Sequence, residues 1–176
     1  MKILYKSFFV LMAASAILPA QAPTDPLIAS SRDLFSQISD LILRSANKIP
    51  EELWSYKPTP EVRTIGQLFA HIADGSNHIC ALATDGKPST VSVEQTAKSK
   101  SEIVAALRKE FAGCMSDYAK MSPASALQTI DLSGVKRTRI AEMDYEVAHT
   151  WEHYGNLVTY MRLKGIVPPS SEPPAK

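Results

Sequence analysis

Apolar residues recur at helical spacing along most of the chain, and this periodicity predicts a bundle of helices. After Asp25-Pro26, which has the form of a helix cap followed by a first-turn proline, Phe35, Ile38 and Ile42 lie three or four residues apart and share one helix face. Three later segments show the same spacing. The four helices are expected at about residues 26–49, 64–84, 99–122 and 141–164.

Residues typical of helix starts stand at the borders of these segments. Thr64 and Gln67 have the spacing of a capping box, in which each side chain bonds the backbone of the other residue, and Ser99 and Glu102 repeat it. Because the four segments have similar lengths and one apolar face each, the predicted fold class is all-α, a four-helix bundle.

The segment between the third and fourth helices has a different pattern. Residues 129–140 alternate between apolar and polar around Ser133-Gly134, which predicts a small β-hairpin. It contains Lys136, Arg137 and Arg139, for which a solvated basic loop is favoured over an anion-binding site.

The N-terminus has the features of a secretory signal peptide. Lys2 and Lys6 precede a short apolar run, Phe8 to Leu18, and small residues follow at 20–22. The run is too short for a transmembrane helix, which needs about 20 apolar residues. Pro23 is a poor residue to follow a cleavage site, so cleavage nearby or an uncleaved tether stays open. The expected organisation is a signal peptide at 1–22, the helical bundle at 23–166 and a flexible proline-rich tail at 167–176.

Export determines how the composition is interpreted. The protein is expected to be periplasmic or secreted, without stable membrane insertion after cleavage, and an oxidising compartment permits a disulfide between Cys80 and Cys114. Two buried free thiols are the alternative. The formal net charge of +1 argues against a nucleic-acid partner, which would require an excess of basic residues.

Two of the four histidines lie one helical turn apart. His149 and His153 share a stripe of the fourth helix beside its core face, a geometry that lets two imidazoles bind one ion. His71, on the second helix, is favoured as third ligand if the two helices are neighbours, whereas His78 lies two turns farther on. Hydrogen-bonded histidines at the core edge, without metal, are the alternative.

Three further residues are candidates for supporting roles beside these histidines. Glu152, Asp74 and Tyr160 are candidates to contact the ligands from behind. His149 to His153 also matches the H-x-x-E-H peptidase motif, with Glu152 as base. That class needs a further acidic ligand downstream, and Glu172 in the proline-rich tail is the only acid there, so peptidase activity is not expected.

Two stretches resemble the DinB-like superfamily. One is Lys57-Pro-Thr-Pro-Glu-Val-Arg-Thr-Ile-Gly-Gln-Leu-Phe-Ala-His71-Ile-Ala-Asp, and the other begins at His149-x-x-x-His153-Tyr-Gly-Asn-Leu-Val. The resemblance implies a four-helix bundle that binds a divalent metal through three histidines, which map to His71, His149 and His153.

Some members of that family are metal-dependent thiol transferases, and the resemblance makes transfer from a small thiol the leading expectation. A non-catalytic metal-binding or structural bundle is the alternative, and a metal-dependent hydrolase is less favoured. Zinc or nickel is preferred as the ion, with iron or copper still open, since imidazole suits all four. A small-molecule substrate and a homodimer are compatible with the sequence.

Overall fold

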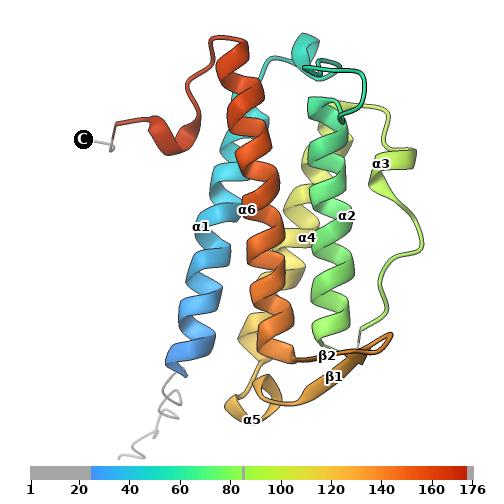
Figure 1. Cartoon of the computed structure of the whole chain (residues 1–176), viewed down its shortest axis with the longest axis vertical. Helices are drawn as coiled ribbons and strands as arrows, with labels where there is room; N and C mark the ends of the chain where they lie inside the picture. The colour runs from blue at the N-terminus through green and yellow to red at the C-terminus, as the bar shows by residue number, and fades with distance from the viewer. Residues whose placement is uncertain (1–24, 85, 174–176) are drawn as a thin grey trace, which may run out of the picture.

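Four long helices form an all-α bundle in the computed structural model, which describes residues 25–84 and 86–173. α1 and α6 run in one direction, whereas α2 and α4 run in the other, and the contacting pairs follow the order α1, α6, α2, α4 around the bundle (Figure 1). The mostly helical fold expected from the periodicity is therefore confirmed. The long helices are α1 (Pro26–Lys48), α2 (Ile65–Ala83), α4 (Lys100–Lys120) and α6 (Arg139–Leu163).

The connection from α2 to α4 returns along the outside of the bundle (Figure 1). Because α2 and α4 are parallel neighbours, the chain must travel back the length of a helix between them. The connection contains the short helix α3 (Val93–Thr96), which packs on α2. Asp74 holds it there, since its carboxylate accepts hydrogen bonds from the Ser92 hydroxyl and from the backbone N–H groups of Val93 and Glu94.

The expected helix caps are confirmed. Asp25 accepts backbone hydrogen bonds at the start of α1, and complete capping boxes begin α2 at Thr64 and α4 at Ser99. Each box satisfies backbone N–H groups that have no partner within the helix, so these residues fix where the bundle helices start.

The core lies between the four helices and is closed at one end by an aromatic pair. Trp54, which follows the short helix η1 (Glu51–Leu53), stacks on Phe69 of α2 with ring centroids 5.1 Å apart. Phe35 of α1 meets Phe111 of α4 edge to face at 5.7 Å. The spacing of Trp151 from Met143 and Val147 predicts that it lies on the core face of α6, and this prediction is wrong, because Trp151 is 36% exposed.

A two-stranded antiparallel hairpin connects the short helix α5 (Pro123–Ala126) to α6, as predicted. Its strands are β1 (Thr129–Leu132) and β2 (Val135–Thr138), and the turn places Ser133 and Gly134 at positive φ. The solvated basic loop expected there is not what the structure shows for two of its residues. Arg137 donates to the buried carboxylate of Glu142 at 2.8 Å and lies over the Tyr145 ring, and Arg139 donates to the carbonyl oxygen of Ala83.

The segment after α6 is more ordered than its proline content predicts. Pro169–Ser171 forms the short helix η2, Pro169 is buried, and the Ser170 N–H donates to the Tyr154 hydroxyl at 3.0 Å. Glu172 then forms ion pairs with Arg44 and Lys48 of α1. The expected flexible tail is thus replaced, up to residue 173, by a strap across α1 and α6.

A disulfide joins Cys80 of α2 to Cys114 of α4, with their Cα atoms 5.5 Å apart. Both residues are buried, so the bond links the two parallel helices inside the core. The predicted signal peptide, residues 1–22, lies outside the described residues. Within the described ranges, no helix is both long enough and apolar enough to span a membrane.

Candidate metal centre

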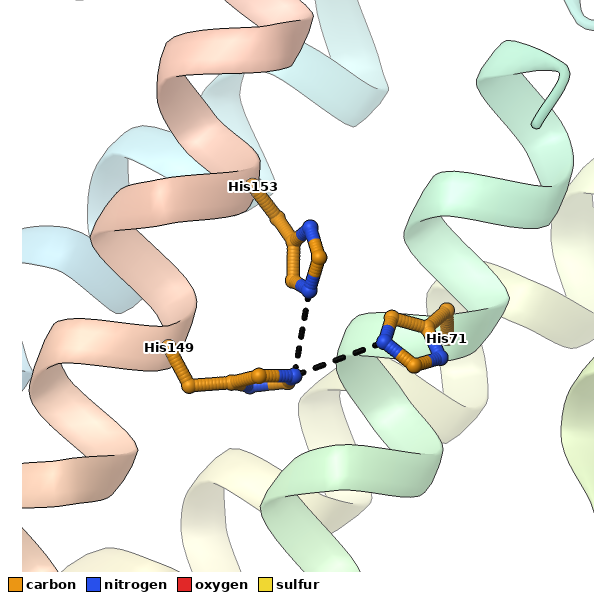
Figure 2. A group of neighbouring side chains, drawn as sticks. All are labelled: His71, His149 and His153. Carbon is orange, nitrogen blue, oxygen red and sulfur yellow. Dashed lines mark hydrogen bonds between the residues drawn. The ribbon is translucent and has the colours of Figure 1, made fainter. Parts of the chain in front are cut away.

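Three histidines converge between α2 and α6. His149 and His153 extend from successive turns of α6, and His71 faces them from α2 (Figure 2). The Nε2 atoms of His149 and His153 are 3.1 Å apart, and those of His149 and His71 are 3.4 Å apart. The structure therefore brings together the three residues proposed as ligands, because α2 and α6 are antiparallel neighbours.

These separations fit a shared metal ion. Two imidazole nitrogens at about 2.1 Å from a zinc-sized ion, at the tetrahedral angle, lie about 3.4 Å from each other. One potential ligand atom from each of the three histidines lies within 4.8 Å of the others. Three protein ligands on one side of an ion leave at least one coordination position for a water or a substrate, as in catalytic zinc sites.

The environment keeps the rings neutral, which is the form that binds a metal. Burial lowers the pKa of His71, His149 and His153, and the proximity of the other two histidines contributes for His153, whose pKa falls to about 4. Neutral imidazoles retain a nitrogen lone pair at neutral pH, so protons compete little with a cation for this site.

A buried carboxylate that the sequence analysis missed lies behind His149. Glu146 is fully buried, and one of its oxygens, Oε1, accepts hydrogen bonds from the hydroxyls of Ser76 at 2.5 Å and Thr150 at 2.9 Å. Its other oxygen, Oε2, lies 3.7 Å from Nδ1 of His149, and neither atom has a hydrogen-bond partner among the described residues. Burial raises the pKa of Glu146 to about 7.

A second carboxylate lies near His71. Oε2 of Glu94 is 3.7 Å from Nδ1 of His71, and Oε1 of Glu94 accepts a hydrogen bond from Nε of Arg63 at 3.0 Å. Carboxylates near Nδ1 favour a proton on that nitrogen and leave the Nε2 lone pair free. With two rings in this tautomer, their lone pairs point into one space, and a cation there relieves the resulting repulsion.

The three residues predicted to support the ligands lie in different surroundings. Asp74 is engaged with the start of α3, as described above, and Tyr160 donates its hydroxyl to the carbonyl oxygen of Arg63 at 3.2 Å. Glu152 is exposed. Its negative charge raises the pKa of His71 and His149 and so partly offsets the lowering caused by burial. Within the described part of the chain, none of these three forms a hydrogen bond to a histidine ring. The carboxylates that approach the rings are Glu94 and Glu146 instead.

The sequence held a signal for Glu146. It falls three residues after Met143 and four before Thr150, both fully buried, so a charged residue occupies a core position of α6. A buried carboxylate is costly unless it has polar partners. Its place one turn from a histidine pair would have marked it as part of the site.

A cavity of about 1050 Å³ adjoins the histidines. His71 and His149 are part of its wall, together with His78 of α2, whose side chain is exposed, and the hairpin residues Leu132 and Val135. His78 is therefore not brought to the other three histidines, but it faces the same space. The cavity is large enough for a small organic molecule.

Comparisons with known proteins agree with this helical architecture. The sequence profile of the DinB superfamily matches residues 34–157, which is more than half of the chain. The chain therefore belongs to the DinB superfamily.

Solved structures agree with this assignment at the level of the fold. A DinB-like protein of Bacillus subtilis is 20% identical with a TM-score of 0.65, covering 77% of this chain and 92% of that one. A DinB-like protein of Bacillus cereus is 16% identical with a TM-score of 0.70, covering 81% and 95%. A mycothiol-dependent maleylpyruvate isomerase is 11% identical with a TM-score of 0.61, covering 76% and 65%. No curated protein matches the chain in sequence.

Proposed function

We propose that the protein is an exported, metal-dependent enzyme that uses a small thiol, with a divalent ion held by His71, His149 and His153. The observation that carries this proposal is the convergence of three neutral imidazoles, with Nε2 separations of 3.1 and 3.4 Å, beside a cavity of about 1050 Å³. A purely structural metal site has no need of adjoining space for a second molecule.

The thiol chemistry follows from what such an ion does. A divalent cation held by the three histidines would lower the pKa of a thiol so that its proton passes to solvent at neutral pH. The sulfur would then form a bond to an electrophilic carbon of an acceptor. An aryl acceptor would release its leaving group with the bonding electrons, and a maleyl acceptor would take a proton from solvent at the neighbouring carbon. The fold neighbour named as a mycothiol-dependent isomerase supports a thiol as the co-substrate.

The chain's own residues have distinct roles in this proposal. The imidazoles hold the ion by Nε2, and Glu146 and Glu94 favour the Nδ1 protons of His149 and His71. The hydroxyls of Ser76 and Thr150 fix the Glu146 carboxylate in turn. The cavity receives the acceptor next to the ion, which limits access of bulk water to the reacting sulfur.

Export is part of the proposal. The basic start, apolar run and small residues within 1–22 support secretion to the periplasm or medium. The buried disulfide between Cys80 and Cys114 also supports an oxidising compartment. The thiol must then be one that is present outside the cytoplasm.

The test begins with metal content. Residues 23–176, purified without a histidine tag, are expected to retain or take up about one zinc or nickel ion per chain. The His149→Ala/His153→Ala variant should bind none, and His78→Ala, a control in the same cavity, should bind as the wild type does. No uptake by the wild type would contradict the metal site.

Activity is tested on the loaded protein. Small thiols are incubated with an electrophilic aryl or maleyl acceptor, and product formation should stop with a chelator and return when metal is added. Metal binding without turnover by any thiol would favour the non-catalytic binding protein over the transferase.

A further inference from the structure

Arg63 lies beside the histidine centre, held at two points. Its Nε donates to Oε1 of Glu94 at 3.0 Å, and the other oxygen of that carboxylate is 3.7 Å from Nδ1 of His71. The backbone carbonyl of Arg63 accepts the Tyr160 hydroxyl at 3.2 Å, just before α2 begins. Glu94 thus lies between Arg63 and the ligand His71 and contacts both side chains.

The terminal nitrogens of Arg63 remain free to bind something else. Among the described residues, only the Nε of this guanidinium has a hydrogen-bond partner, Glu94. The side chain is 42% exposed, so Nη1 and Nη2 are accessible to a ligand. A guanidinium anchored by one nitrogen presents the other two in a fixed plane, which suits two-point binding of a carboxylate.

The charge of Arg63 favours an anion beside the centre. The guanidinium is linked to the ligand His71 through Glu94, whose two oxygens lie 3.0 Å from Nε of Arg63 and 3.7 Å from Nδ1 of His71. A bound cation would add positive charge near this pair, so an anionic group of the substrate beside Arg63 is favourable in the loaded state.

The cavity and Arg63 lie at different parts of the centre. His71 and His149 line the cavity, whereas Arg63 and His153 are not among its lining residues. A carboxylate held by Arg63 would therefore lie outside the cavity, which stays available to a second molecule.

We propose that Arg63 binds the carboxylate of the thiol substrate, so that the substrate is a small organic thiol that carries a carboxylate near its sulfur. This inference rests on the proposed function and narrows its substrate class. The sulfur would bind at the ion, the carboxylate would pair with Nη1 and Nη2 of Arg63, and the acceptor would enter from the cavity. Glu94 is the positioning residue for both Arg63 and His71.

The experiment uses the mature protein loaded with cobalt(II), whose absorption spectrum reports ligands at the ion. Three probes are titrated at one pH: mercaptoacetate, which has both groups; 2-mercaptoethanol, which has only the thiol; and acetate, which has only the carboxylate. Dissociation constants are measured for the wild type, for Arg63→Gln and for Arg108→Gln, an exposed residue of α4 that serves as the charge-matched control. Cobalt content is measured in each sample.

The expected result is a selective loss. Arg63→Gln should weaken the binding of mercaptoacetate by about tenfold, which is the effect of one hydrogen-bonded charge pair. The dissociation constant of 2-mercaptoethanol should stay within about twofold of the wild-type value. Arg108→Gln should change neither, and cobalt content should not fall in Arg63→Gln, since a repelling charge is removed. Equal preference for mercaptoacetate over 2-mercaptoethanol in wild type and Arg63→Gln would overturn the inference and leave the thiol function intact.

The opposite failure is also distinguishable. If neither thiol perturbs the cobalt spectrum, the proposed thiol function fails, and acetate then tests Arg63 alone. Weaker acetate binding in Arg63→Gln would support an anion site at Arg63, whereas unchanged acetate binding would overturn it.

Discussion

The backbone of Gly75 on α2 lies directly against the imidazole of His149. A Cβ atom built at Gly75 would be 2.3 Å from Cε1 of His149, closer than nonbonded carbon atoms approach. α2 therefore has a glycine in its interior, at a cost in helix propensity of about 1 kcal/mol, where the ring must enter. The absence of a side chain at Gly75 is what lets His149 point toward His71.

Gly75→Ala should thus separate metal binding from stability. The alanine favours the helix but displaces the His149 ring, and we expect metal affinity to fall at least about tenfold, as for residues that orient ligands. Isothermal titration with zinc measures the effect. Gly113→Ala on α4, where an added Cβ meets nothing within 4 Å, is the control and should bind zinc as the wild type does. Equal affinity in both variants would contradict this role of Gly75.

Glu146→Gln should weaken metal binding without removing a ligand. The amide keeps the size of the side chain but loses the negative charge that favours the Nδ1 proton of His149. A decrease in zinc affinity of about 10- to 100-fold is expected, measured by competition with a chromophoric chelator. Glu152→Gln, an exposed carboxylate on the same helix, should change the affinity much less.

Glu146 should also determine how the stability of the metal-free protein depends on pH. Its folded pKa of about 7 is above the unfolded value, so the folded state binds the extra proton and gains stability as the pH falls from about 7 to 4.5. His153 has the opposite effect, because its folded pKa of about 4 is below the unfolded value and stability is lost as the pH falls from 6.5 toward 4. The two effects offset each other in the wild type.

In Glu146→Gln the offset is removed. Chelator-treated Glu146→Gln should be more stable than the wild type at pH 8 by roughly 3 kcal/mol, since no buried charge must form, and this advantage should fall below about 1 kcal/mol by pH 5. Urea denaturation at both values measures it. A constant difference between the two proteins across this range would show that Glu146 has an ordinary pKa.

The disulfide is expected to be important for stability and unimportant for the ligands. It closes a chain segment of 34 residues, for which restriction of the unfolded chain predicts a stabilisation of roughly 4 kcal/mol. The Cys80→Ala/Cys114→Ala variant should lose about this much free energy of unfolding. Its zinc stoichiometry should remain about one, because the disulfide joins α2 to α4 whereas the histidines converge between α2 and α6. Loss of zinc from a variant that still has native circular dichroism would contradict that separation.

The sequence predicted the bundle well because helix starts and apolar faces are local features. Thr64 and Ser99 begin their helices through neighbouring residues alone, and the hairpin turn at Ser133 is equally local. The exposed position of Trp151 could not be predicted, since it depends on which neighbouring helix covers that part of α6. The buried position of Glu146 was missed although its spacing from Met143 places it on the core face. The ordered strap ending at Glu172 was missed because it is held by distant residues of α1.

In the candidate site, too, the features set by local helix geometry could be predicted, and those set by contacts between distant segments could not. His149 and His153 are one turn apart, so their proximity follows from the helix, and His71 was chosen by assuming that its helix was the neighbour. The environment of these rings could not be derived, because Glu94, which lies near His71, belongs to α3 in the connection between α2 and α4. The sequence does not mark Arg63 as part of the site either, since its position beside the histidines depends on that same contact with Glu94.

Because of the order of the helices around the bundle, a bound ion would connect two helices that the disulfide does not connect. His71 and His149 are 78 residues apart, so a bound ion would cross-link a segment more than twice as long as the one the disulfide closes. The disulfide joins α2 to α4 and would leave α6 free to separate, whereas the ion would join α2 to α6. If α6 separates from α2, the ion is released while α2 and α4 remain joined by the disulfide. A chelator would trap the released ion and so report the fraction of molecules that open between α2 and α6.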